Sequence, residues 1–454
     1  MEALSIIFEW LMSGILPFII LLGVLIFVHE LGHFSVAKFF GVRVETFSIG
    51  FGKTLYKKKF SEDGTEYSVG LIPLGGYVKM LESHEIKDEP SDLVYKNCFD
   101  KQSVYKRFLI VAAGPIFNLI LAVIFFTFVH FSGITGMKPY IQEITNSQNN
   151  IIMTDKKNEI IAVNDVTTKR WQDVRVEVLN TIVNGDDLLL KVKTDNAINN
   201  INIIYDKDIL KQEGDVLRNI GIIPKQPLLP PIIGDVQDDS PASLAGLKKH
   251  DNVLSINNEP VNNWNSLSNY IQNNPDEILQ LKISRENDIL DIILVPSRQD
   301  NNFGYAGISA QRKYLDEYRV LVQYPLLDSI NKSFRLTYDY SILTFKMIFE
   351  LFTGQANINN ISGPLSIAEF SGKSLSMGAV YFAYLLAILS ISLGVLNLLP
   401  IPMLDGGHLV YYVIEMVIGR PVSDKIQLVA QQFGLAILLG IMILAFYNDF
   451  TRLL

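Results

Sequence analysis

The chain has 454 residues, of which 49% are hydrophobic and 19% are charged, and its formal net charge is −8. This length exceeds that of one ordinary domain, and the acidic balance argues against a nucleic-acid partner. The single cysteine, Cys98, excludes an internal disulfide and a metal cluster built from cysteines.

Four apolar blocks are long enough to cross a bilayer, which requires about 20 mostly apolar residues. They cover about 15–40, 108–131, 381–402 and 428–447. The first block has no basic residues before it, so we do not interpret it as a cleaved signal peptide. The fold class predicted from this pattern is a polytopic α-helical membrane protein with four transmembrane helices, in two membrane parts at 1–135 and 381–454.

Lysine and arginine predict the orientation of these helices, because they concentrate in the inner loops of membrane proteins. The loop between the first two blocks carries such residues near its ends: Arg43, Lys53, Lys57, Lys58, Lys59, Lys101, Lys106 and Arg107. The tail before the first block has none, and the loop after the third block carries Arg420 and Lys425. This distribution places both termini and the large middle region on the outer side.

The first block contains His29-Glu-Leu-Gly-His33. Two histidines four residues apart on a helix lie about 40° apart around its axis, so both rings can reach one ion. Zinc suits neutral imidazole ligands, and Glu30 is placed to take a proton from an attacking water. The alternative is that these polar groups merely pair with neighbours. Ionisable residues inside an apolar segment are costly and usually functional, which favours a metal site.

Residues 43–82 follow this block and alternate β-forming residues with glycines around a charged turn at 61–64. The pattern predicts a β-hairpin. Its tip residues Leu71, Ile72 and Leu74 are apolar, so we expect the tip to dip into the bilayer; the alternative is a plain hairpin on the inner side.

The second block opens with small residues and Asn118, within Ala112-Ala-Gly-Pro-Ile-Phe-Asn118. Small residues allow another helix to approach closely, and an asparagine can hydrogen-bond across the contact. We interpret Asn118 as structural.

The middle of the chain is soluble in character and contains two similar units, at 136–228 and 229–313. In the later unit, strand patterns at 232–236, 253–257, 279–284 and 290–294 surround a small-residue turn at 240–246 and a helix from Trp264 to Ile271. This order resembles a bacterial PDZ domain; the earlier unit lacks the turn. PDZ domains bind peptides as an added strand. The resemblance implies peptide contacts at Gly221, Ile222, Gly307 and Ile308, and the alternative is a spacer that excludes bulky substrates.

Residues 314–380 form the next segment. From about 316 to 354 it has an amphipathic helical pattern, interrupted by Pro325. We weigh a helix lying on the outer leaflet against a helix packed on the two PDZ-like units.

The third block ends in Asn397-Leu-Leu-Pro400-Ile-Pro402-Met-Leu-Asp405-Gly-Gly-His408. Two prolines at this spacing cannot remain in a regular helix, so the chain must unwind. Asp405 can then complete a zinc site of two histidines and a carboxylate. The first and third blocks run in the same direction, which places His29, His33 and Asp405 toward the inner face. We expect His408 to be structural rather than a ligand.

His29-Glu-Leu-Gly-His33 together with Asn397-Leu-Leu-Pro-Ile-Pro-Met-Leu-Asp405-Gly-Gly resembles the site-2 protease family of intramembrane zinc proteases. The tandem PDZ-like units and the motif Ile72-Pro-Leu-Gly-Gly-Tyr-Val-Lys-Met80 are similar to the sigma-E-regulating group of Gram-negative bacteria.

The resemblance implies one zinc ion per chain, Glu30 as the catalytic base, and substrate contacts at Asn397, Gly75 and Gly76. The substrates implied are single-span membrane proteins: anti-sigma factors of the envelope stress response and remnant signal peptides. The implied location is the bacterial inner membrane, in contact with lipid, with periplasmic termini and PDZ units and an active site toward the cytoplasm. The alternative function is an inactive PDZ scaffold that binds exposed C-termini.

Overall fold

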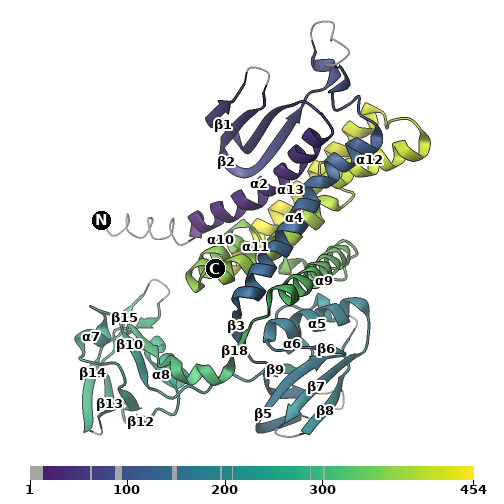
Figure 1. The fold of residues 1–454 in the computed structure, drawn as a ribbon. Coiled ribbons are helices and arrows are strands. Elements are labelled where there is room, and N and C mark those ends of the chain that lie inside the picture. The colour runs from purple at the N-terminus through teal and green to yellow at the C-terminus, as the bar shows by residue number, and fades with distance from the viewer. Residues whose placement is uncertain are drawn as a thin grey trace. The chain divides into compact units, whose positions relative to one another are not determined.

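The computed structural model describes residues 14–61, 64–86, 95–145, 151–194, 197–206, 208–286, 288–299 and 302–453. The chain forms two compact units (Figure 1). The first contains the described residues up to Ile134, then Asp206–Gly214, then Val322 onward; the second contains Thr135–Tyr205 and Asp215–Leu321. The short stretch 206–214, which the sequence places inside the earlier PDZ-like unit, is bound to the first unit because Asn357 donates hydrogen bonds to the carbonyls of Leu210 and Lys211.

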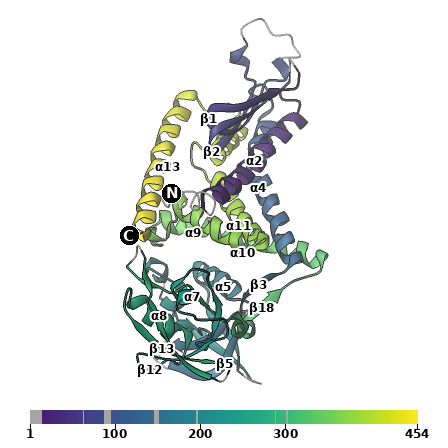
Figure 2. The ribbon, with the colours of Figure 1, turned by 90° about the vertical axis from the view of Figure 1, so that its left-hand side faces the viewer.

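The first unit is built on long apolar helices. Among the described residues, four are long and apolar enough to cross a membrane, as the sequence predicts. They are α2 (Leu16–Phe39), α4 (Val104–Ser132), α11 (Ala379–Leu398) and α13 (Asp424–Leu453). Figure 2 shows α13 as a long helix at the edge of this unit.

Helix α4 is the centre of the bundle, in contact with both α2 and α11. Leu21, Leu25 and Leu121 pack with Phe382 and Leu386 in its core. A side chain on Gly32 would come within 2.5 Å of the Ala113 carbonyl oxygen, so the α2 and α4 backbones approach closely here. A row of α4 side chains spaced four residues apart is exposed and apolar, as expected for a surface in contact with lipid tails: Ile116, Ile120, Ile124 and Phe128.

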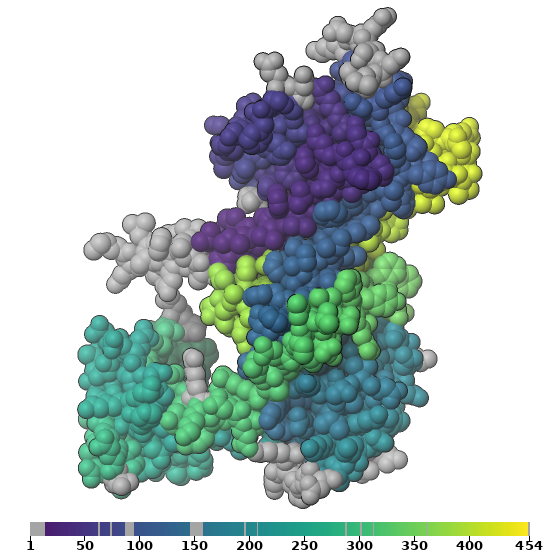
Figure 3. Space-filling view, in the orientation of Figure 1, coloured from purple at the N-terminus to yellow at the C-terminus, as the bar shows by residue number. Residues whose placement is uncertain are grey.

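The predicted hairpin is present as β1 (Val44–Lys59) and β2 (Glu66–Met80). Phe47 of β1 pairs with both Val78 and Tyr67 of β2, so the hairpin must bend strongly to bring both residues beside it. The surfaces of the hairpin, α2 and α4 are continuous on one face of this unit (Figure 3). Leu71 and Ile72 are exposed as the prediction of an apolar tip requires, whereas the Leu74 side chain and residues 62–63 of the turn lie outside the described part.

Helix α11 ends at Leu398, four residues before the predicted end of the third block, because Pro400 and Pro402 cannot continue it. Residues 399–404 are irregular, and Met403 has a φ of 92°. A further helix, α12 (Asp405–Ile418), then begins, which the sequence pattern does not predict. Its first turn is tightly packed, since side chains on Gly406 and Gly407 would come within 2.0 Å of the Leu399 carbonyl oxygen and 2.6 Å of the Ile401 carbonyl oxygen.

The amphipathic segment is partly as predicted. After Pro325 the helix α9 (Leu326–Phe352) forms, but residues before the proline form the 3-10 helix η4 (Arg312–Tyr318) and the strand β18 (Arg319–Val322) instead of a helix. The α9 face that packs within the unit is small and polar, with Ser329, Ser333 and Thr337 buried, and α9 contacts α4 and α11. The chain continues through η5 (Ile358–Asn360) and α10 (Pro364–Met377).

The second unit begins with a six-stranded sheet in the order β8-β7-β5-β4-β9, with β6 paired to β5. After β3 (Ile134–Met137), its elements are β4 (Tyr140–Thr145), β5 (Ile151–Val163), β6 (Val166–Thr167), α5 (Trp171–Asn184), β7 (Leu188–Thr194), β8 (Ala197–Ile203), α6 (Val216–Asn219) and β9 (Ile222–Pro224). The 3-10 helix η3 (Ile209–Lys211), which lies between β8 and α6 in the chain, belongs to the first unit.

The rest of the second unit contains a four-stranded sheet in the order β12-β11-β13-β14, with β10 paired to β17 and β15 to β16. Its elements are β10 (Ile233–Val236), α7 (Pro241–Leu244), β11 (Asn252–Ile256), β12 (Glu259–Pro260), α8 (Trp264–Asn273), β13 (Leu279–Arg285), β14 (Asp288–Leu294), β15 (Ser297–Arg298), β16 (Gly304–Tyr305) and β17 (Ile308–Ala310). A separate apolar core, including Leu267, Leu281 and Ile283, lies between α8 and the sheet. The strand–helix–strand order predicted from the sequence is confirmed, and its PDZ identity stays a prediction.

Candidate metal centre

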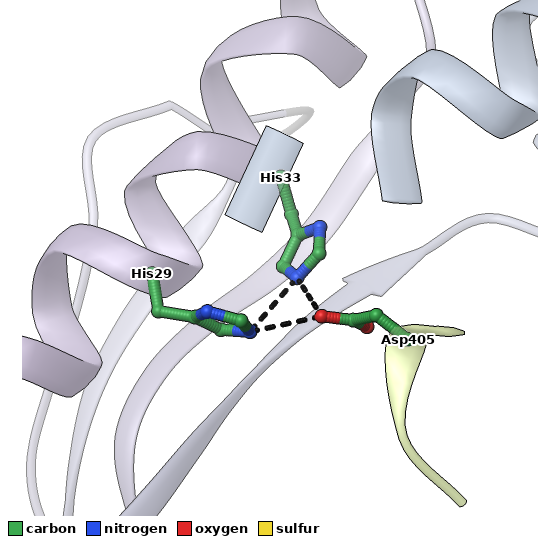
Figure 4. Close-up of side chains that lie close together, drawn as sticks. All are labelled: His29, His33 and Asp405. Carbon is green, nitrogen blue, oxygen red and sulfur yellow. Dashed lines mark hydrogen bonds and ion pairs between the residues drawn. The ribbon is translucent and has the colours of Figure 1, made fainter. Parts of the chain in front are cut away.

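Three side chains from two helices converge on one point of the first unit (Figure 4). His29 and His33 extend from consecutive turns of α2, and Asp405 is the first residue of α12. Asp405 Oδ2 lies 3.1 Å from His29 Nε2 and 3.4 Å from His33 Nε2, and the two Nε2 atoms are 3.3 Å apart. The structure thus brings together all three predicted ligands.

His33 is oriented by the backbone of α4. Its Nδ1 donates a hydrogen bond of 2.9 Å to the Ile110 carbonyl oxygen, which has a second lone pair beyond the one used in the helix. In neutral imidazole, a proton on Nδ1 leaves Nε2 as a lone pair. The His33 Nε2 lone pair therefore faces Asp405.

His29 is contacted from the same helix by a side chain. The Asn118 amide nitrogen lies 3.2 Å from His29 Nδ1, and Asn118 is fully buried, with 0% exposed. The sequence predicts an interhelical contact for Asn118. It does not predict that the partner is a candidate metal ligand. The signal was present, because Asn118 is a polar residue inside an apolar block, the feature that singled out His29 and His33.

The room for the imidazoles comes from a glycine of α4. A Cβ on Gly114 would lie 2.3 Å from His33 Nε2 and 2.9 Å from His29 Cε1. Gly76 of β2 plays a similar part for Glu30, since a Cβ there would lie 2.8 Å from Glu30 Cγ. Glycines at both positions allow the α4 and β2 backbones to lie directly against the cluster.

The three atoms fit a metal cation. Asp405 Oδ2 is buried and has no hydrogen-bond partner, although two imidazole nitrogens lie near it. A carboxylate oxygen and two nitrogen lone pairs repel one another, and burial makes that repulsion strong. A cation between them removes the repulsion, and two histidines with one carboxylate are a common catalytic zinc set.

A cavity of about 1520 Å³ connects this cluster with the other predicted residues of the first unit. Glu30, Gly75, Gly76 and Asn397 line it, as do the three candidate ligands. His408 also lines the cavity but is not part of the ligand cluster. The remaining predicted contacts belong to the second unit: Gly221 precedes β9, Ile222 begins it, Gly307 precedes β17 and Ile308 begins that strand.

Charged side chains surround the rest of the cavity. Lys79 Nζ lies 2.9 Å from both Glu45 and Glu85, and the hydrogen bonds to these carboxylates, that to Glu45 first, raise the pKa of Lys79. Arg107 of α4 pairs with Glu415 of α12 at 2.6 Å. The cavity therefore has a charged wall next to the apolar helix bundle.

Comparison with known proteins identifies the family of the chain. The sequence matches Peptidase family M50 over residues 17–441. The regulator of sigma-E protease RseP of Escherichia coli strain K12 is 37% identical over 451 residues, covering 96% of this chain and 98% of the relative. The protein of that name from Salmonella typhimurium is 37% identical over 447 residues with the same coverage. A Vibrio cholerae relative whose name includes "zinc metalloprotease" is 38% identical over 453 residues, again with 96% and 98% covered.

Proposed function

Because this chain belongs to peptidase family M50, we propose that it cleaves peptide bonds within the membrane, using one zinc ion held by His29, His33 and Asp405. The observation that carries the proposal is the convergence of two imidazole nitrogens and an unpaired carboxylate oxygen beside the buried Glu30. The cluster lies in the unit that contains the four membrane-length helices found among the described residues, and one of them, α2, carries His29 and His33.

Zinc, when bound, supplies a Lewis acid that polarises the attacking water and the scissile carbonyl. Glu30 is 8% exposed and lines the cavity, so it is the base that takes the proton from the attacking water. The same carboxyl then protonates the leaving amine. The absence of a side chain on Gly76 leaves space for the Glu30 side chain, since a Cβ there would lie 2.8 Å from Glu30 Cγ.

A transmembrane substrate must unwind before cleavage, because its carbonyl groups are bonded within its own helix. We propose that residues 69–78 of the hairpin hold the unwound segment as an added strand, near Gly75 and Gly76. Asn397 lines the cavity from the last turn of α11 and is placed to hydrogen-bond that segment or the developing oxyanion. Capping of the broken helix end is the rival role of Asn397.

The biological setting follows from the relatives named as regulators of sigma-E protease. We propose that this chain is a multi-pass protein of a bacterial inner membrane with periplasmic termini and a cytoplasm-facing active site. Its substrates are single-span membrane proteins: an anti-sigma factor of the envelope stress response and remnant signal peptides. The two strand-rich parts of the second unit act as periplasmic PDZ domains at 136–228 and 229–313, with Gly221, Ile222, Gly307 and Ile308 beside the bound peptide or as part of a size filter.

The decisive experiment is cleavage of a tagged, outer-side-trimmed single-span protein in membranes, by the wild type and by Glu30→Gln. We expect the variant to bind zinc as the wild type does and to form no product. Glu82→Gln, which changes another glutamate lining the cavity, is the matched control and should retain cleavage. Equal product from Glu30→Gln and the wild type would overturn the proposal. The inactive-scaffold alternative predicts no cleavage by any form, and no observation on the site favours it.

A further inference from the structure

We propose that Asn118 is a positioning residue that sets which nitrogen of His29 faces the metal. It does so by accepting a hydrogen bond from His29 Nδ1–H through its side-chain oxygen. The Nε2 lone pair of His29 is then directed toward Asp405. This inference rests on the proposed zinc site and adds a residue on α4 to the machinery that holds it.

The first observation is the burial of Asn118 against His29. The Asn118 side chain is 0% exposed, and its amide nitrogen lies 3.2 Å from His29 Nδ1. Its other polar atom, Oδ1, is buried without a hydrogen-bond partner. An unpaired amide oxygen in an apolar interior is costly, of the order of a lost hydrogen bond, so a buried oxygen of this kind calls for a donor.

The second observation concerns the chemistry that His29 needs. A neutral imidazole has one N–H and one lone pair, so Nε2 can bind a metal only if Nδ1 carries the proton. That Nδ1–H then requires an acceptor, and an amide nitrogen is not one. Rotation of the Asn118 amide by about 180° exchanges its nitrogen and oxygen in the same volume. The exchange brings Oδ1 to the Nδ1–H of His29 and so provides the donor that the oxygen lacks.

His33 provides the internal comparison. Its Nδ1 donates to the Ile110 carbonyl oxygen at 2.9 Å, two helical turns before Asn118 on the same face of α4. Both ligating histidines are therefore contacted at Nδ1 by α4, one by its backbone and one by a side chain. Acceptors of this kind fix the ring orientation and increase the basicity of the ligating nitrogen.

Asn118 is itself held from behind by α11. Ser390 Oγ donates a hydrogen bond of 2.7 Å to the Asn118 carbonyl oxygen. A Cβ on Gly394 would lie only 3.1 Å from the Pro115 carbonyl oxygen, so the α11 backbone is close to this part of α4. Asn118 thus lies between α11 and His29. In this position its side-chain amide can exchange nitrogen and oxygen by rotating about the Cβ–Cγ bond.

The test measures zinc affinity in the full-length chain in detergent, by competition with a chelator, for the wild type, Asn118→Leu, Asn118→Asp and Ser390→Ala. Leucine keeps the volume but has no acceptor, so we expect zinc to bind about 10- to 100-fold more weakly. Aspartate keeps the acceptor and should bind zinc at least as tightly as the wild type. Ser390→Ala removes only a hydrogen bond to the backbone carbonyl oxygen of Asn118 and keeps its side-chain amide, so it should weaken zinc binding much less than Asn118→Leu does. The absorption spectrum of bound Co²⁺ provides a second readout, which should change only in Asn118→Leu.

A folded Asn118→Leu protein with wild-type zinc affinity would overturn the inference. If the leucine variant does not fold, as judged by circular dichroism, the aspartate variant decides: zinc binding more than tenfold weaker than in the wild type contradicts an acceptor role. These failures are distinct from failure of the proposed function. A wild-type chain that binds no zinc would refute both proposals, whereas equal binding by the wild type and the leucine variant refutes only this one.

Discussion

His29 and His33 reach the candidate metal centre from consecutive turns of an unbroken helix, whereas Asp405 reaches it from the first residue of a helix that follows a break. In the first half of the site, the period of α2 fixes the spacing of the two ligands, and α4 fixes their orientation through Ile110 and Gly114. In the second half, no helical period relates Asp405 to the preceding α11.

The position of Asp405 depends instead on tight backbone contacts in the irregular segment. Gly406 packs against the Leu399 carbonyl oxygen, where an added Cβ would come within 2.0 Å. Gly434 of α13 packs against the Pro402 carbonyl oxygen, where an added Cβ would come within 1.9 Å. Local helix geometry therefore determines one half of the candidate centre, and packing of distant backbone segments determines the other. Glycine-to-alanine variants in α4 and in α12 test the two halves separately.

The largest effect is expected for Gly114→Ala. Alanine favours a helix by up to about 1 kcal/mol over glycine, so any loss must come from the clash with the histidines. Its Cβ would lie 2.3 Å from His33 Nε2. We expect kcat/KM for substrate cleavage to fall by about 100-fold or more, since displacing a site by about 1 Å has effects of that size. Gly23→Ala is the control, because a Cβ at Gly23 meets nothing within 4 Å. Full activity of Gly114→Ala would contradict the packing of α4 on the ligands.

Gly406→Ala tests the second half. A Cβ at this position would come within 2.0 Å of the Leu399 carbonyl oxygen, so the first turn of α12 and Asp405 with it must move. We expect cleavage to fall by about 10- to 100-fold, with weaker zinc binding measured by chelator competition. Gly440→Ala on α13, where the added Cβ meets nothing within 4 Å, should behave as the wild type. If Gly406→Ala binds zinc normally, Asp405 is less dependent on this contact than we infer.

Asp449→Ala tests whether the part of α13 far from Gly434 stabilises only the fold or also positions Asp405. The buried Asp449 carboxylate accepts hydrogen bonds from the backbone N–H groups of Gly363, Leu365 and Ser366, at the start of α10. Loss of these charge-assisted bonds should lower the free energy of unfolding by about 1.5–3 kcal/mol, seen as a lower Tm. Zinc affinity should be unchanged, because this contact lies far along α13 from Gly434. A loss of zinc as large as that in Gly406→Ala would mean that the whole length of α13 positions Asp405.

The smallest effect concerns pH and the loop that leads into α4. Burial raises the pKa of Asp100, but hydrogen bonds from the Ser83 hydroxyl and backbone N–H outweigh it and lower the pKa overall. A carboxyl whose folded pKa lies below its unfolded value of about 3.9 stabilises the fold above that pH and loses this contribution as the pH falls through the folded pKa. The Tm difference between the wild type and Asp100→Asn should therefore be constant near neutral pH and shrink below about pH 4. The contribution is at most about 1 kcal/mol, because the side chain is partly exposed. A difference that grows on acidification would contradict this sign.

The sequence predicts that His29, His33 and Asp405 cluster because the two motifs that contain them depend on local rules. The helix period accounts for His29 and His33, and the two prolines account for the end of α11. Helix α12 was missed because its 14 residues are too short to be recognised as a span and directly follow a predicted break. The contact of Asn118 with His29 joins residues 89 apart in the chain, and its partner depends on the rotation of α4 about its axis, which hydrophobic pattern alone does not fix.

The segment 399–404 also has a consequence for how this chain can change over evolution. It packs against Gly406 at one end and against Gly434 in its middle. Met403 adopts a backbone conformation with positive φ that is unfavourable for residues other than glycine. Inserting or deleting one residue would shift Asp405 by about 1.5–3.4 Å relative to the histidines, more than a metal–ligand bond tolerates. The number of residues between Leu398 and Asp405 therefore sets the position of Asp405 relative to the histidines. We expect this segment to tolerate substitutions better than any change in its length.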